Sequence, residues 1–172
     1  PAGPAAARNA GAERAAGELL LFLGADIVPS RRLLERHRSV HQRHPEETVG
    51  CRGFVPWAPP LPPTPRRGWL EHGGNQNAFG EIAGQRFVDC QSYCYGANLS
   101  LKRSLFRRVG GFDAQHFPHY GWEDLELGMR LFAQGFQLFY EPAARAVHLH
   151  TQLSVENLRR QKLLGRGLVT LE

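Results

Sequence analysis

Two adjacent carboxylates, Glu123 and Asp124, follow a glycine and a tryptophan at the start of a predicted helix. In the first turn of a helix, the positive end of the dipole keeps such carboxylates ionised. An ionised carboxylate can accept a proton, so the pair is a candidate for a general base. The alternative is that both are ordinary first-turn residues that complement the dipole.

The predicted helix has an apolar stripe at helical spacing, which indicates that one of its faces is buried. The stripe consists of Trp122, Leu125, Met129 and Phe132. We therefore expect the carboxylates to lie at the mouth of the helix, outside its buried face. Upstream, Gly110 and Gly111 let the backbone turn where a side chain would obstruct a neighbouring element or a ligand. The loop that follows them is rich in His, Phe and Tyr, and this context favours a ligand site.

The segments GGFD and GWEDLELGMRL resemble the acceptor-side signature of family-2 glycosyltransferases and of the galactosyltransferase carboxyl-terminal region, both on the GT-A fold. The resemblance implies that Asp124 is the base that deprotonates the acceptor hydroxyl, and that Glu123 and Trp122 line the acceptor site. It also implies that Gly110 and Gly111 let the backbone approach the donor sugar.

Other positions match further parts of the family pattern. The segment ARNAG resembles the helix that these enzymes place before their metal strand, with Arg8 near the donor; a solvated helix residue is the alternative. Asn98, in GANLS, matches a position that contacts the donor sugar in relatives. Trp69 lies in a polar and aromatic segment that suits stacking on a sugar or a lipid-linked acceptor, although simple packing would also explain it.

The candidate metal ligands lie near the two ends of the chain. Residues 18–23 predict a strand buried on both faces of a parallel sheet, and ligands bind at the carboxyl ends of such strands. Family members usually have Asp-x-Asp there; here Gly24 replaces the first Asp and Asp26 remains. The resemblance implies that Asp26 binds Mn²⁺ or Mg²⁺ and that His148 is the second ligand, with His150 as the runner-up. The alternatives are a turn aspartate and a hydrogen-bonded histidine.

Composition narrows the class of protein. The net charge of +5 resides almost entirely on arginine, which favours bidentate contact with an anionic partner such as a nucleotide diphosphate. The longest apolar run is too short to span a membrane. Three cysteines make a disulfide framework improbable and favour a reducing compartment such as the cytoplasm. A basic amphipathic helix at 154–172 would either pack on the domain or lie along an anionic membrane surface.

We expect one α/β domain over residues 1–172 with the GT-A fold, a Rossmann-like and mostly parallel sheet flanked by helices. Because the first helix leads directly into the metal strand, the chain would be the C-terminal two-thirds of such a domain. Residues 56–80, rich in proline, predict an extended loop on the acceptor side. The other expected elements are helices at 4–17 and 30–44 and strands at 48–55, 86–101, 136–140 and 143–150.

Three histidines of the helix at 30–44, His37, His41 and His44, share one face, which we interpret as a solvated basic face rather than a metal site. In the same helix, Leu33, Leu34 and Val40 are expected to point inward. Cys90 and Cys94 lack a second pair at zinc spacing, so buried free thiols are expected.

The resemblance implies a metal-dependent glycosyltransferase that moves a sugar from a nucleotide-diphosphate sugar to the hydroxyl of a saccharide or lipid-linked acceptor, with inversion if it is a family-2 enzyme. A non-catalytic sugar- or nucleotide-binding relative is the alternative, suggested by Gly24. A nucleic-acid-binding module rests on charge alone and lacks a basic motif interleaved with aromatic residues, so no nucleic-acid partner is expected.

Overall fold

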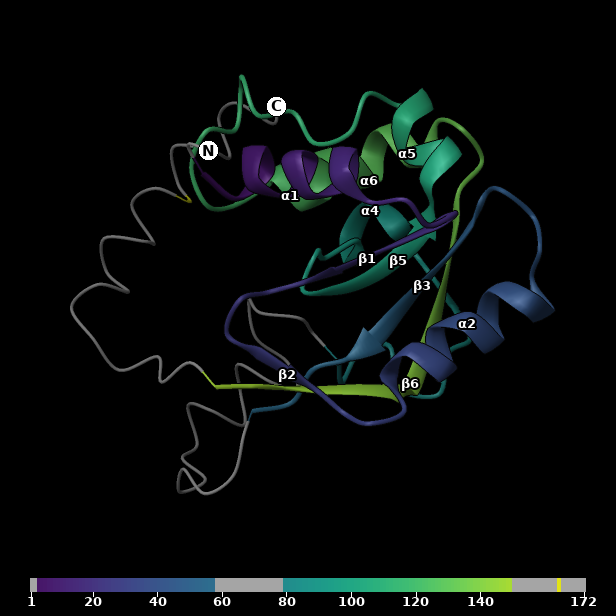
Figure 1. The fold of residues 1–172 in the computed structure, drawn as a ribbon. Helices are drawn as coiled ribbons and strands as arrows, with labels where there is room; N and C mark the ends of the chain where they lie inside the picture. The colour runs from purple at the N-terminus through teal and green to yellow at the C-terminus, as the bar shows by residue number, and fades with distance from the viewer. Residues whose placement is uncertain (1–2, 58–78, 150–163, 165–172) are drawn as a thin grey trace.

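The computed structural model describes residues 3–57, 79–149 and 164. They form a mixed sheet with helices on both faces, which confirms the α/β class (Figure 1). Helices α1, α5 and α6 lie on one side of the sheet and α2 lies on the other. The helices are α1 (Gly3–Arg14), α2 (Leu33–Arg43), α4 (Cys90–Tyr93), α5 (Arg103–Arg108) and α6 (Glu123–Phe132). The strands are β1 (Leu19–Leu23), β2 (Ile27–Pro29), β3 (Val49–Phe54), β4 (Phe87–Val88), β5 (Asn98–Lys102) and β6 (Gln137–His148).

The strand directions differ from the expectation. The order in the sheet is β1-β5-β3-β6-β2, and β4 also pairs with β6. Among the described strands only β3 and β6 run parallel, and the other pairings are antiparallel. The prediction of a mostly parallel sheet is therefore wrong for these residues. Strand β1 alternates between buried and half-buried residues, as an antiparallel strand does, instead of being buried on both faces.

Strand β6 is a single element of 12 residues, where we expected two strands joined at Glu141-Pro142. In its pairing with β3, Gly53 faces Glu141 but Phe54 faces Arg145, so residues 142–144 form a bulge. Proline cannot donate a hydrogen bond to the ladder, and a bulge leaves its extra residues unpaired. The bulge therefore accommodates Pro142, and the strand continues to His148.

Helix α2 covers the other face of the sheet, and its buried side is more polar than predicted. Leu33 and Val40 point inward as expected, but Leu34 is 70% exposed. His37 and His41 are buried, which contradicts the solvated face that we expected. Ring nitrogens of both histidines lie 2.8 Å from the hydroxyl of Ser100 on β5. Burial lowers the pKa of both, that of His41 to about 4, so they are neutral at pH 7.

Helix α6 starts where the sequence predicts, but a different face of it is buried. Leu127, Gly128 and Leu131 face the core, whereas Met129 and Phe132 of the predicted stripe are 41% and 56% exposed. A Cβ atom at Gly128 would lie 2.4 Å from the carbonyl oxygen of Cys90, so glycine permits close packing on α4. The three cysteines are buried free thiols, which confirms the expectation for Cys90 and Cys94.

Candidate active site

The first-turn carboxylates of α6 are held by an arginine from α1. Nη1 of Arg8 lies 2.7 Å from Oε1 of Glu123 and 3.0 Å from Oδ1 of Asp124. The guanidinium also lies over the ring of Phe112, with Cζ 5.2 Å from the ring centre. One cation from a separate helix therefore neutralises part of the charge of the carboxylate pair.

Glu123 lies in the buried face of α6 instead of at an open helix mouth. Its exposed fraction is 1%, and its Oε2 accepts a hydrogen bond of 2.7 Å from the backbone N–H of Gly121. This bond closes a turn in which Gly121 and Trp122 have φ angles of 113° and 71°. A left-handed tryptophan is strained, so the contacts of Glu123 help to hold the geometry at the helix start. The indole N–H of Trp122 donates to the carbonyl of Leu164 over 2.6 Å.

Asp124 is the partly exposed member of the pair, with 17% of its side chain accessible. Burial raises its pKa to about 6, and the carboxylate of Glu123 adds to the rise while the guanidinium of Arg8 opposes it. Asp124 is therefore still ionised at pH 7, but burial leaves its pKa closer to neutrality than that of an exposed carboxylate in the first turn of a helix. A pKa near 6 suits a group that must be ionised at neutral pH and still accept a proton.

Two residues that the sequence reasoning missed also surround Asp124. The backbone N–H of Gly96 donates to its carboxylate, and a Cβ atom at Gly96 would lie only 2.9 Å from Oδ1 of Asp124. Arg52 of β3 is 1% exposed, and its Cζ lies 4.7 Å and 4.8 Å from the ring centres of Phe79 and Tyr95. Its positive charge also lowers the pKa of Asp124. Gly96 is part of the GANLS motif, whereas an arginine within a short strand gives no such signal.

The structure brings Asp26 and His148 together. Oδ2 of Asp26 lies 3.5 Å from Nε2 of His148, with 47% and 13% of the two side chains exposed. Antiparallel pairing of β2 with β6 sets Ile27 opposite His148, and the N–H of Leu149 donates to the carbonyl of Asp26 over 2.8 Å. The ring of Trp57 packs edge-on against that of His148, with centres 4.7 Å apart.

This oxygen and nitrogen pair suits a divalent cation such as Mn²⁺. Two protein ligands leave positions for substrate oxygens and water, as is usual where a cation binds a diphosphate. Among the residues that the structure describes, no group of three or more candidate ligands gathers, so the fit rests on this pair. His150 lies outside the described residues, and so does Trp69.

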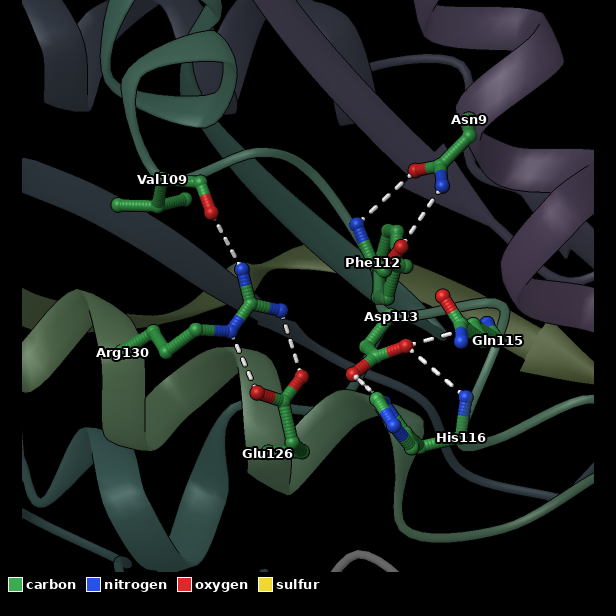
Figure 2. Close-up of polar contacts among 8 residues, drawn as sticks. All are labelled: Asn9, Val109, Phe112, Asp113, Gln115, His116, Glu126 and Arg130. Atoms are coloured by element: carbon green, nitrogen blue, oxygen red, sulfur yellow. Dashed lines mark hydrogen bonds and ion pairs between the residues drawn. The ribbon is translucent and has the colours of Figure 1, made fainter.

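Three further residues that were predicted to contact the donor, Gly110, Gly111 and Asn98, have structural roles within the fold. Gly110 and Gly111 have φ angles of 84° and 72°, which allow the sharp turn after α5. The side chain of Asn9 bonds both the N–H and the carbonyl of Phe112 next to this turn, so α1 holds it (Figure 2). Asn98 is 1% exposed and its amide bonds His37 and the carbonyl of Ala144, so we do not assign it a direct donor contact.

Figure 2 shows how the loop between this turn and α6 is fixed. Arg130 donates to the carboxylate of Glu126 and to the carbonyl of Val109, which ties α6 to the end of α5. Asp113 accepts hydrogen bonds from the backbone N–H groups of Gln115 and His116 over 3.1 Å and 3.0 Å. The GGFD segment therefore builds the turn that leads toward the carboxylates.

In Figure 1 the end of β1, the start of α6 and the end of β6 all lie toward the same side of the molecule. The Asp26–His148 pair and the Arg8–Glu123–Asp124 cluster are thus carried by elements that reach the same side. That both line one cleft stays a prediction. None of the described helices is both long and apolar enough to cross a membrane.

Comparisons with known proteins identify the family. The sequence profile described as "Glycosyl transferase family 2" matches residues 1–110, more than half of the chain. The chain belongs to this family. A second profile, "N-terminal domain of galactosyltransferase", matches residues 86–152, which contain the GGFD and GWED segments. The resemblance proposed from the sequence is thus confirmed.

Similar curated proteins are longer than this family-2 chain. It is 34% identical over 163 residues to the pre-mycofactocin glycosyltransferase of Mycobacterium tuberculosis (strain CDC 1551 / Oshkosh), with 88% of this chain and 31% of that protein covered. It is 30% identical over 165 residues to the O-antigen biosynthesis protein RfbC of Myxococcus xanthus, with 83% and 12% covered. The chain therefore spans less than a third of the length of these relatives, which agrees with the partial domain that we expected.

Solved structures confirm the GT-A fold. The mannosyltransferase PcManGT from Pyrobaculum calidifontis, in complex with GDP-Man and Mn²⁺, superposes with a TM-score of 0.62 at 18% identity, covering 99% of this chain and 43% of that one. GalNAc-T7 with UDP, GalNAc and Mn²⁺ gives a TM-score of 0.61 at 16% identity, covering 88% and 31%. At such identities the likeness shows the fold alone.

Proposed function

We propose that this family-2 chain carries the acceptor and cation-binding part of a glycosyltransferase. The enzyme would move a sugar from a nucleotide-diphosphate sugar to the hydroxyl of a saccharide or lipid-linked acceptor. The observation that carries the proposal is the environment of Asp124, a partly exposed carboxylate beside Arg8. Burial raises the pKa of Asp124 to about 6, and the positive charge of Arg8 limits this rise. This environment supports a base that is ionised at pH 7 and can take a proton.

The residues have separate tasks in this reaction. Asp124 takes the proton of the acceptor hydroxyl as the hydroxyl oxygen attacks the anomeric carbon. The bond from that carbon to the diphosphate oxygen breaks on the opposite face, so the nucleoside diphosphate leaves and the configuration is inverted. Glu123 anchors Arg8 and the Gly121–Trp122 turn, and so positions the base. Trp122 lines the acceptor site, and Arg8, beside the base, lies near the donor. The backbone at Gly110 and Gly111 approaches the donor sugar.

Asp26 and His148 hold the divalent cation. When bound, Mn²⁺ would supply a Lewis acid that neutralises the diphosphate leaving group. The imidazole favours Mn²⁺ over Mg²⁺, since Mg²⁺ is bound mainly by oxygen ligands. Gly24 stands where the family pattern has Asp, and a Cβ atom there would lie 2.9 Å from Oδ1 of Asp26. Glycine thus permits the observed orientation of the Asp26 carboxylate.

The proposal extends to the location of the enzyme in the cell. The buried free thiols of the described residues support a reducing, cytoplasmic location. Contact with the inner face of a membrane would bring the site to a lipid-linked acceptor. A similar protein, covering 31% of this chain at 42% identity, is the N-acetylglucosaminyl-diphospho-decaprenol L-rhamnosyltransferase of Mycobacterium tuberculosis, whose name describes such an acceptor.

The test is donor turnover by the purified protein. UDP- and GDP-linked sugars are incubated with Mn²⁺, and release of the nucleoside diphosphate is measured with and without EDTA. The proposal expects turnover that EDTA abolishes and that Mn²⁺ restores. Saturable nucleotide binding without turnover of any donor would support the alternative, a non-catalytic relative, which Gly24 in place of the usual Asp favours.

A further inference from the structure

A chain of buried hydrogen bonds runs from α2 through β5 to β6, and its directions can be assigned. The amide Nδ2 of Asn98 donates to the carbonyl of Ala144 over 2.8 Å, which turns Oδ1 toward Nε2 of His37, also at 2.8 Å. Because Oδ1 can only accept, Nε2 of His37 carries the proton. Nδ1 of the neutral His37 then accepts from the hydroxyl of Ser100, which accepts in turn from Nε2 of His41.

The side chain of Asn98 reaches β6 by crossing over β3. Cys51 pairs with Ser100 and Arg52 with Leu99, so the register continues with Gly53 opposite Asn98. A Cβ atom at Gly53 would lie 2.2 Å from Nδ2 of Asn98 and 2.2 Å from the carbonyl oxygen of Ala144. Only glycine leaves room for this contact, so the sequence of β3 is fitted to the crossing.

The backbone and the side chain of Asn98 each contact a segment that carries a candidate cation ligand. The backbone of Asn98 pairs with Leu23, the last residue of β1, three residues before Asp26. Its side chain holds Ala144 in the bulge of β6, four residues before His148. Strands β1 and β6 are not neighbours in the sheet, since β5 and β3 lie between them. Asn98 therefore links the two segments directly.

We propose that Asn98, oriented by His37, is a positioning residue that fixes the segments carrying Asp26 and His148 relative to each other and so presets the cation site. This inference rests on the proposed function. If this buried hydrogen-bond network served only stability, each of its polar atoms should have a hydrogen-bond partner. Here Nδ1 of His41 is buried and has no hydrogen-bond partner among the described residues, so the chain of bonds is not an optimal filling of the core.

The test measures Mn²⁺ affinity rather than activity. Electron paramagnetic resonance of free Mn²⁺ gives the dissociation constant of the purified protein with UDP present and, separately, with GDP. Asn98→Leu keeps the size and neutrality of the side chain but removes the bond to Ala144. Loss of a partner that bonds a metal ligand directly weakens binding about 10- to 100-fold. Asn98 acts through Ala144 and Leu23 and not on a ligand itself, so we expect a loss near the lower end, about tenfold.

Ser100→Ala is the matched control. Ser100 lies on the same strand, is 1% exposed and belongs to the same chain of bonds, but its hydroxyl bonds the two α2 histidines and not β6. We expect Ser100→Ala to lower the midpoint of urea unfolding and to leave the Mn²⁺ affinity within about twofold, since the hydrogen bond from Asn98 to Ala144 of β6 is intact in this variant. If Asn98→Leu does not fold, Asn98→Ser removes the reach to Ala144 with a smaller polar side chain and carries the same expectation.

The possible outcomes separate the inference from the function on which it rests. Wild-type protein that binds Mn²⁺ while the Asn98 variants bind it equally well would overturn the inference alone. Equal weakening in the Asn98 and Ser100 variants would also overturn it, in favour of a general packing role. Wild-type protein that binds no Mn²⁺ with either nucleotide would overturn the cation site and the inference together.

Discussion

The two halves of the proposed site are built in different ways. The base side is closed: Asp124 is held between Arg8, the N–H of Gly96 and the buried Glu123. The cation side is open: Asp26 has 47% of its side chain exposed and lies 3.5 Å from His148. One side is therefore held by a buried ion-pair cluster, whereas the other consists of a half-exposed Asp26 beside a His148 with 13% of its side chain exposed.

The difference follows from the chemistry that each side would perform. A base must have its pKa set before substrate arrives, and fixed charges in a desolvated cluster set it. A cation that binds together with a diphosphate needs free coordination positions, so an open pair serves it better than a closed cage. The comparison predicts that changes on the base side alter the rate and its pH dependence, whereas changes on the cation side alter metal affinity.

Asp124→Asn is expected to have the largest effect. The amide cannot accept the proton of the acceptor hydroxyl, so kcat should fall by about 10²- to 10⁴-fold, the usual contribution of a general base. Donor affinity, measured by isothermal titration with UDP- or GDP-sugar in the presence of Mn²⁺, should stay within about threefold of wild type, since the substitution leaves the cation pair untouched.

Glu126→Gln is the control for this prediction. Glu126 lies on the same helix and pairs with Arg130, away from the Arg8 cluster. Its substitution should change kcat by less than about threefold, because surface and helix ion pairs contribute little. A loss of donor binding in Asp124→Asn as large as the loss of rate would contradict the role assigned to Asp124.

Asp26→Asn should act on the other side. Removing one of two protein ligands should weaken Mn²⁺ binding at least about tenfold, the lower bound for loss of a mere outer-sphere partner. Excess Mn²⁺ should therefore recover part of the activity. Asp113→Asn is matched to it, because Asp113 also faces an imidazole, with Oδ2 2.7 Å from Nδ1 of His116, but caps a turn. If the Mn²⁺ affinity falls equally in Asp26→Asn and Asp113→Asn, Asp26 is not a specific ligand of the cation.

The sequence predicted the main helices and the start of α6, but not the short strand β2 or which faces of the helices are buried. The apolar stripe assigned Met129 and Phe132 to the core, yet they are largely exposed. Glu123 takes a buried position instead, because Arg8, 115 residues away in the chain, neutralises it. A local pattern of apolar residues cannot reveal a partner at that separation.

The same limit applies to the other errors. His37 is buried because Ser100 and Asn98, 63 and 61 residues further along the chain, bond both of its ring nitrogens. The antiparallel directions of the sheet depend on pairings between distant segments, which an apolar run such as that of β1 does not encode. The local structure of the motifs was easier to predict, because GGFD and GWED each include residues whose hydrogen bonds form their own turn or helix start.

The smallest effect that we predict is also the most specific to the closed side. Asp124 must be ionised to act, and its pKa of about 6 means that wild-type kcat/KM should fall as the pH drops below 6. The guanidinium of Arg8 holds this pKa down, so Arg8→Met should move the acidic limb of the pH–rate profile upward by about one pH unit. Arg8→Lys keeps the charge and should leave the limb near pH 6, and Arg14→Met, on the exposed face of the same helix, should not move it.

Because Arg8→Met leaves the buried Glu123 without its cation, the free energy of unfolding of this variant should also fall by about 3 kcal/mol. A limb that stays at pH 6 in folded Arg8→Met protein would mean that burial alone sets the pKa of the base, and the closed cluster would then serve packing instead of catalysis.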